Sequence, residues 1–184
     1  MRTMPDRDRP AAATHGPVVR RADAQVRIGR HNDAMPLLFV YGSLKQGFPN
    51  EHVNTGRRVA GRYRTGERYP MYLLGPGEVP CLVSPPGAGH QVIGELYEVN
   101  DDDLRRMDRL ERIGEPQGYE RVEVAVERFD TPAVARLRAL VYVKQDRAIA
   151  ATTQRIGPLP EYRQEHAARF HWRGASEPAP EETE

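Results

Sequence analysis

Apolar residues in this chain occur as short runs that glycine and proline interrupt, a pattern that predicts short strands. The run at 37–41 holds five apolar residues and ends at a tyrosine, as expected of a buried strand. Gly75-Pro76-Gly77 and Asp130-Thr131-Pro132 are typical turn sequences, and the second is expected to join a hairpin. The expected strands are 37–41, 68–74, 79–84, 91–99, 119–129 and 134–143.

Helical periodicity is clear at 101–113, where Leu104 and Met107 share one side and Asn100 is placed to cap the first turn. A second, weaker helix is expected at 161–170. Several short strands with few helices predict an α+β fold. We therefore expect a small curved or barrel-like mixed sheet with one or two packed helices.

Three segments of the chain differ in composition. Residues 1–34 hold few apolar residues and no sustained periodicity, which predicts a disordered N-terminal extension. Residues 175–184 are acidic and contain prolines, which predicts a second disordered tail. At 184 residues the chain is long enough for one domain with tails, so we expect that domain at 35–174.

Charge and cysteine content narrow the function classes. Lys and Arg total 27 against 26 Asp and Glu, so we expect no charge-driven binding of nucleic acid or of a membrane surface. No apolar run approaches the roughly 20 residues that cross a bilayer, and residues 1–34 lack the apolar core of a secretory signal. A single cysteine, Cys81, excludes an internal disulfide and is typical of a reducing compartment. We expect a cytoplasmic protein, and the sequence indicates no particular oligomeric state.

The end of the first strand is a candidate binding site. Gly42 follows Tyr41 directly and precedes Ser43 and Leu44. Glycine permits a turn where a Cβ would clash, so successive backbone N–H groups can point at one spot. Such donors favour a carboxylate or a developing oxyanion. An ordinary glycine loop is the alternative interpretation.

A carboxylate lies within the apolar stripe of the predicted helix. At about 100° per residue, Glu111 projects between Leu104 and Met107. Burial of an ionised carboxylate is costly unless its pKa rises, and a raised pKa suits a general acid or base near neutral pH. The alternative places Glu111 at the edge of the stripe, in water or paired with an arginine. Of the competing carboxylates, we expect Asp108 to face solvent or an arginine, and Glu95 to bind nearby backbone or hydroxyl groups.

Other catalytic chemistries lack the residues that they need. Ser43 is not part of G-x-S-x-G and no His–acid pair has a place beside it, so we expect no serine nucleophile. The histidines form no H-E-x-x-H and the glycines form no P-loop, so the sequence predicts neither a metal nor a cofactor. Lys45 could attract an anionic group of a substrate or, alternatively, remain a solvated lysine.

Four short motifs together resemble one known family. Residues 41–50, Y-G-S-L-K-Q-G-F-P-N, resemble the Y-G-[ST]-L-K-x-G-x-x-N signature of γ-glutamylcyclotransferase-like (AIG2-like) proteins, most of all the γ-glutamylamine cyclotransferase branch. Residues 92–99 are similar to the family's G-E-[LV]-Y strand, and 107–111 to its L-D-x-[FL]-E segment. Residues 118–121, G-Y-E-R, are similar to its Y-x-R. The motifs keep the family's order, and only together are they specific.

The resemblance implies an enzyme of transferase or lyase type that acts on a small γ-glutamyl-amine. The α-amine of the substrate would attack its own γ-carbonyl, giving 5-oxoproline and a free amine. The resemblance assigns the general acid/base to Glu111. The substrate-binding residues that it implies are Tyr41, Gly42, Ser43 and Leu44. Tyr119 and Tyr142 are further candidates that would add hydroxyl groups, and we include Tyr119 among the substrate-binding residues.

Two other functions use the same pocket. A non-catalytic member of the family would bind a small γ-glutamyl metabolite without turning it over. A deprotecting enzyme would remove a γ-glutamyl group from a biosynthetic intermediate by identical chemistry. The loop between Glu111 and Tyr119 borders the acid/base, so we expect it to influence selectivity for the leaving amine.

Overall fold

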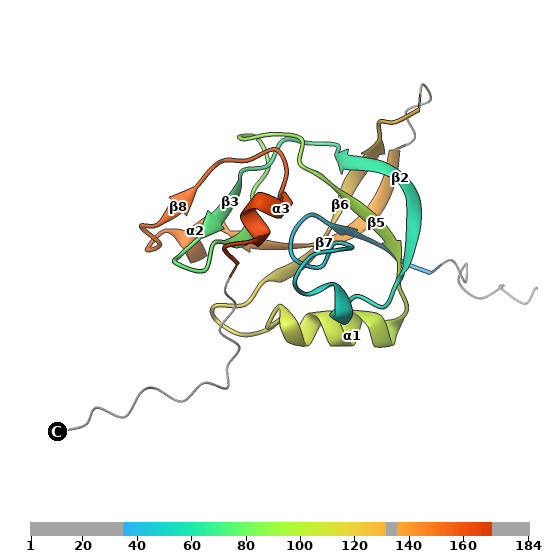
Figure 1. Cartoon of the computed structure of the whole chain (residues 1–184), viewed down its shortest axis with the longest axis horizontal. Helices are drawn as coiled ribbons and strands as arrows, with labels where there is room; N and C mark the ends of the chain where they lie inside the picture. Colours follow the sequence, from blue (N-terminus) through green and yellow to red (C-terminus); the bar gives the residue numbers. More distant parts are fainter. Residues whose placement is uncertain (1–34, 132–135, 171–184) are drawn as a thin grey trace, which may run out of the picture. The chain divides into compact units, whose positions relative to one another are not determined.

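The computed structural model describes residues 35–131 and 136–170, so the predicted tails at 1–34 and 175–184 lie outside the described residues. The strands are β1 Leu37–Val40, β2 Arg57–Thr65, β3 Met71–Leu74, β4 Val79–Ser84, β5 Ile93–Glu98, β6 Glu120–Arg128, β7 Arg136–Gln145 and β8 Arg155–Ile156. The helices are α1 Asp101–Leu110, α2 Asp146–Ile149 and α3 Gln164–Ala167, with a 3-10 helix η1 at Glu51–Val53. The predicted α+β class is confirmed (Figure 1).

Five strands close into a small barrel. In the order β1–β5–β2–β6–β7 all neighbours are antiparallel, and β7 then pairs with β1 in parallel through Leu38 and Leu140. Beyond β7 the sheet continues through β4, β3 and β8, and β4 runs parallel to β7. Closure leaves the five barrel strands without a free edge. The predicted barrel-like mixed sheet is therefore confirmed, as is the hairpin of β6 and β7.

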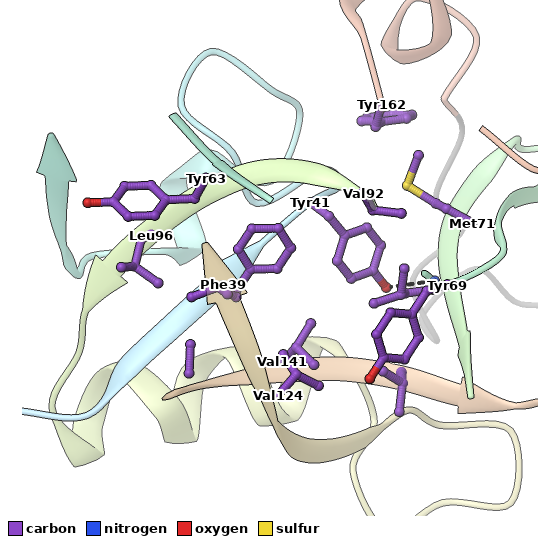
Figure 2. Close-up of a cluster of buried hydrophobic side chains, with 14 of the residues drawn as sticks. Phe39, Tyr41, Tyr63, Tyr69, Met71, Val92, Leu96, Val124, Val141 and Tyr162 are labelled. Atoms are coloured by element: carbon purple, nitrogen blue, oxygen red, sulfur yellow. Dashed lines mark hydrogen bonds between the residues drawn. The ribbon is translucent and has the colours of Figure 1, made fainter. Parts of the chain in front are cut away.

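Strand β1 is apolar throughout because both of its faces are buried. Phe39 and Tyr41 enter one hydrophobic cluster, and Figure 2 shows their rings side by side within it. Leu38 and Val40 enter a second cluster, which includes Met107 of α1. Side chains of successive strand residues point to opposite faces, so this strand packs against both clusters at once. Its end is consequently fixed from two sides, where the candidate binding loop begins.

Helix α1 begins and ends at identifiable signals. Asn100 and Asp103 form a capping box, in which each side chain accepts a hydrogen bond from the backbone N–H of the other. The helix ends at Leu110 rather than at the predicted 113. Arg112 has φ of 56° and Gly114 has φ of 88°, both in the left-handed region that a helix cannot continue through. The predicted helix at 161–170 is also shorter, since only α3 is helical there.

One long strand, β2, has no counterpart among the predicted strands. Its sequence contains four arginines and one glycine, Gly61, so neither alternation nor apolar content marks it. The pairing of β2 with β5 is interrupted between Val59 and Tyr63, which indicates a bulge. The strand predicted at 68–74 begins later, at Met71. None of the helices in the described part of the chain is long and apolar enough to span a bilayer.

Candidate active site

A pocket lies between the end of β1 and the C-terminal end of α1. It is lined by Phe39, Val40, Tyr41, Gly42, Ser43, Leu44, Asn50, Val79, Pro80, Leu110, Glu111, Tyr119, Tyr142 and Phe170. The structure thus brings every residue that the sequence predicted for the site to one pocket. The barrel achieves this because β1, β6 and β7 are neighbours in space while α1 packs beside them.

The loop after β1 offers backbone donors that the protein itself does not use. Lys45 N–H donates to the Gly42 carbonyl at 3.2 Å and Asn50 N–H donates to the Ser43 carbonyl at 2.9 Å. The hydrogen bonds of the described residues include none donated by the backbone N–H of Gly42, Ser43 or Leu44. Unpaired N–H groups beside a pocket are suited to bind an anionic oxygen.

Glycine is required at position 42 by a close approach of the chain. A Cβ built on Gly42 would lie 2.8 Å from Cγ of Pro80, closer than real Cβ atoms come to a neighbour. Pro80 belongs to β4 and also lines the pocket. The loop therefore packs on β4 with no room for a side chain, which fixes the direction of its N–H groups.

Tyr41 is tied into the fold through its hydroxyl group. The hydroxyl donates to the Tyr142 carbonyl at 2.9 Å and accepts from the Leu82 N–H at 3.0 Å. Burial raises the pKa of Tyr41, so the group stays neutral. Tyr119 is held in a similar way, because its hydroxyl donates to the Pro80 carbonyl at 3.0 Å. The protons of both hydroxyls are therefore already used within the protein.

Ser43 has no general base among its contacts. Its hydroxyl oxygen accepts a hydrogen bond from the Asn50 side-chain amide at 3.0 Å. An amide N–H group cannot take a proton from serine, and the hydroxyl has no histidine or carboxylate partner among the described residues. The contact orients Ser43 and Asn50 on the same pocket wall, as a polar pair beside the unpaired N–H groups.

Glu111 directly follows Leu110, the last residue of α1, and its backbone still has helical angles. Its N–H donates to the Met107 carbonyl at 2.8 Å, and its carbonyl accepts from the Tyr119 N–H at 2.9 Å. The side chain is half-buried and lines the pocket. Burial raises the pKa of Glu111 to about 7, the positive charge of Lys144 opposes that rise, and the charge of Asp108 adds to it. Within the described residues, no ion pair or hydrogen bond engages the Glu111 carboxylate.

The two competing carboxylates are occupied elsewhere. Asp108 accepts two hydrogen bonds from Arg121, at 2.8 and 2.6 Å. Glu95 accepts from the Tyr97 hydroxyl at 2.7 Å and from the Gln46 N–H at 2.9 Å. Both expectations from the sequence are confirmed. A carboxylate that is already paired is a poor proton acceptor, so Glu111 is the better general base of the three.

Several lining residues carried no assigned role in the sequence. Asn50 ends the first motif and could have been recognised from it. Val79 and Pro80 begin a predicted strand and Phe170 ends a predicted helix, but none of the three lies in a motif. Their position depends on the parallel pairing of β4 with β7 and on the path of the chain after α3.

Lys45 is neither solvated nor part of the pocket. It is only 5% exposed, its Nζ donates to the Tyr162 carbonyl at 2.5 Å, and it lies 4.2 Å from the centre of the Phe48 ring. Of the two alternatives for Lys45, the solvated lysine was therefore wrong, because the loop folds this side chain inward. In the described part of the chain, no cluster of three or more His, Cys, Asp or Glu residues is arranged to hold a metal ion.

Comparisons with known proteins agree with this geometry. The family described as "Gamma-glutamyl cyclotransferase, AIG2-like" matches residues 38–164. A gamma-glutamylaminecyclotransferase of Bos taurus is 41% identical over 95 residues, which are 49% of this chain and 56% of that protein. The Rattus norvegicus protein of the same name is 39% identical over 97 residues, 50% of this chain and 64% of that one. These matches thus span less than two thirds of either relative.

The fold has solved counterparts as well. The crystal structure of an AIG2-like protein from Mus musculus is 28% identical, with a TM-score of 0.62. The match covers 78% of this chain and 99% of the mouse chain. The small barrel with few helices is therefore the architecture of that group of proteins.

Proposed function

Because the chain belongs to the gamma-glutamyl cyclotransferase, AIG2-like family, we propose that it is a cyclotransferase acting on γ-glutamyl-amine compounds. One observation carries the proposal: an unpaired, half-buried carboxylate with a raised pKa lines the same pocket as three unpaired backbone N–H groups. Those are the two functions that intramolecular cyclisation requires, a proton carrier and a site for negative charge. The names of the curated relatives point to the same reaction.

Glu111 carries the proton through the reaction. As the carboxylate it takes a proton from the α-ammonium of the substrate, and the freed amine nitrogen attacks the γ-carbonyl carbon. A new C–N bond closes the five-membered ring, and the carbonyl oxygen becomes an oxyanion. Collapse of this intermediate breaks the bond to the leaving amine, which receives the proton back from Glu111. The ring nitrogen, which carries two protons after the attack, loses one of them through the re-formed carboxylate to solvent, so that the lactam is neutral. Nucleophile and electrophile belong to one molecule, so holding the substrate folded supplies much of the rate gain.

The N–H groups of Gly42, Ser43 and Leu44 bind negative charge. Two substrate groups are suited to them, the α-carboxylate and the oxyanion that forms on the γ-carbonyl oxygen. Among the described lining residues, Glu111 is the only carboxylate and there is no lysine, arginine or histidine; the others are apolar, tyrosine, serine and asparagine residues. Backbone donors therefore take the place that an arginine would hold in many carboxylate sites.

The remaining lining is apolar and is suited to the leaving amine. Val79, Leu110 and Phe170 lie in the same pocket and contribute no charge. We assign them to the carbon chain of the amine, since the polar groups are engaged by the γ-glutamyl end. A small metabolite as substrate and a cytoplasmic location belong to the same proposal, and the lone, buried thiol of Cys81 is consistent with that location.

The assay offers purified protein a panel of γ-glutamyl-amines, γ-glutamyl-lysine and glutathione, and quantifies 5-oxoproline and the released amine. We expect turnover of γ-glutamyl-amines in preference to glutathione. Phe170→Ala should lower kcat/KM about 10-fold for an amine with a long carbon chain and little for γ-glutamyl-methylamide. Phe129→Ala is the matched control, because this ring is also half-buried but packs against Arg62 outside the pocket.

Two outcomes would contradict the proposal. Unchanged turnover in Glu111→Gln would exclude the proposed base. Binding of 5-oxoproline or of a γ-glutamyl-amine without turnover of any panel member would instead favour the non-catalytic binding protein. Isothermal titration calorimetry of the same compounds separates these outcomes.

A further inference from the structure

A short linker, residues 112–118, joins the two pocket residues Glu111 and Tyr119. The hydrogen bond from the Tyr119 N–H to the Glu111 carbonyl, at 2.9 Å, closes this linker into a loop. Most of the linker is exposed. A Cβ on Gly118 would lie 1.8 Å from the carbonyl oxygen of Arg112, so the loop is tight at its base. The position of Glu111 thus depends on a loop that has little contact with the core.

Lys144 holds this loop from the barrel side. It lies on β7, opposite Val83 of β4 in the parallel pairing. Its Nζ donates to the carbonyl of Gln117 and also lies 3.4 Å from the carbonyl oxygen of Gly118. The same Nζ is 4.5 Å from the centre of the Tyr119 ring. Two successive carbonyls and one aromatic face therefore surround a single ammonium group.

The charge of Lys144 also acts on Glu111. The ammonium opposes the rise in the pKa of Glu111. Burial lowers the pKa of Lys144 itself, and the Glu111 carboxylate opposes that fall. Asp108 acts in the opposite direction, but its own charge is paired with Arg121. The other ionisable groups that Glu111 affects are Tyr41, Tyr119 and Cys81, and burial keeps all three neutral. Lys144 is therefore the cation that favours the ionised form of the general base.

We propose that Lys144 is a positioning residue for the reaction, which fixes the 112–118 linker and supplies the positive charge that favours the ionised carboxylate of Glu111. This inference rests on the proposed role of Glu111 as base. Nothing in the motifs marks Lys144, which follows the apolar run of β7 as one of many charged residues at strand ends. Its role follows from its contacts with the linker and with the Tyr119 ring.

The test measures kcat/KM against pH for wild type, Lys144→Met and Lys144→Arg, with a γ-glutamyl-amine as substrate. In Lys144→Met we expect the acidic limb to move upward by about one pH unit, because an opposite charge at this range shifts a carboxyl pKa by that order. Activity should fall about 5-fold at the wild-type midpoint and recover toward high pH. Lys144→Arg keeps the charge and should keep the midpoint.

Lys45→Met is the matched control. Lys45 also donates to a backbone carbonyl and also lies over an aromatic ring, but its charge interacts with Glu161 and Glu95 rather than with Glu111. Its removal should leave the midpoint of the acidic limb unchanged. An equal loss of activity in Lys144→Met at every pH would overturn the electrostatic part of the inference and leave only a structural clamp.

A second measurement keeps this inference independent of turnover. Carboxyl ¹³C NMR of glutamate-labelled protein, with Glu111 assigned by its absence in Glu111→Gln, follows its titration without substrate. A higher midpoint in Lys144→Met supports the role of Lys144 even if no substrate in the panel is turned over. An unchanged midpoint rejects it, whatever the assay shows.

Discussion

The loop at 41–44 and the helix end at Glu111 line the same pocket, yet the fold holds them in different ways. The loop continues β1, which is buried on both faces, and the Tyr41 hydroxyl bonds the backbone of both β4 and β7. Glu111 continues into an exposed linker that Lys144 and the Arg112–Glu115 ion pair hold by side-chain contacts. One wall is fixed by the core and the other by contacts at the surface.

This difference matches the two chemical tasks. Backbone N–H groups stabilise negative charge without changing their own protonation, so they act best when they cannot move. A general base must bind and release a proton, so its surroundings have to accommodate both charge states. The half-buried position of Glu111 beside one cation allows this. The more rigid part of the pocket is thus the loop at 41–44, whose protonation does not change, and the less rigid part is Glu111, whose protonation does.

Of the substitutions in the two parts of the pocket, loss of the base Glu111 should lower kcat the most. Glu111→Gln keeps the shape of the side chain but cannot take a proton, so we expect kcat to fall by about 10³-fold. Single-turnover kinetics with a γ-glutamyl-amine measures the effect. Circular dichroism at matched temperature serves as the control for folding, since the glutamine side chain should pack like the glutamate.

The same substitution should stabilise the protein at alkaline pH. Burial raises the pKa of Glu111 from its ordinary 4.5 to about 7, so between these values the folded chain binds a proton that the unfolded chain lacks. Stability is therefore lost as pH rises through this window. At pH 8 we expect Glu111→Gln to be more stable than wild type by about 3 kcal/mol, and to differ little at pH 4. Urea denaturation at the two pH values tests this, and an equal difference at both would contradict it.

Displacement of the loop at 41–44 should lower kcat by less than the loss of Glu111 does, and the factor should not depend on pH. The Cβ of Gly42→Ala meets Pro80, and we expect the loop to move and kcat to fall by about 10²-fold, as on loss of one oxyanion donor. Ser43→Ala is the control, because it removes the hydroxyl without moving the backbone, and it should lower kcat only a few-fold. A larger loss in Ser43→Ala than in Gly42→Ala would mean that the hydroxyl, not the backbone, does the work.

The smallest expected effect on activity is that of removing the Tyr41 hydroxyl, which anchors the loop. Tyr41→Phe leaves the Leu82 N–H and the Tyr142 carbonyl without their partner, so we expect a loss of about 1 to 2 kcal/mol in the free energy of unfolding. The kcat of the folded protein should change little, since this hydroxyl faces the core. Thermal denaturation and the 5-oxoproline assay on the same sample separate the two effects.

The sequence predicted those parts of the fold and site that local patterns determine. The apolar run of β1, the capped start of α1 and the hairpin of β6 and β7 all carry signals of their own. Strand β2 does not, because its arginines and its glycine bulge resemble a loop. The predicted end of α1 lay too far along the chain. The helix stops before Arg112, whose backbone is in the left-handed region, and arginine is not a residue that marks such a position.

The same limit applies to the site. Glu111 could be predicted because a carboxylate in an apolar stripe is unusual in itself, and Gly42 because a glycine after a buried strand is a turn signal. Phe170 and Lys144 could not be, because the residues that lie beside them come from distant strands and loops. A residue whose role depends on strand order has no local signature.

The hydrogen bond between Tyr41 and Tyr142 also has a consequence for synthesis of the chain. The two residues are 101 positions apart, and no partner for the Tyr41 proton exists until β7 has been made. At about 5 to 20 residues per second, the first strand waits roughly 5 to 20 s on the ribosome before its barrel can close. Both edges of Leu37–Val40 are unpaired until β5 has been made, and one edge stays unpaired until β7 follows. An apolar strand with a free edge is the kind of segment that chaperones bind. The residues that finally fix the pocket are thus among the last to be paired as the protein is made.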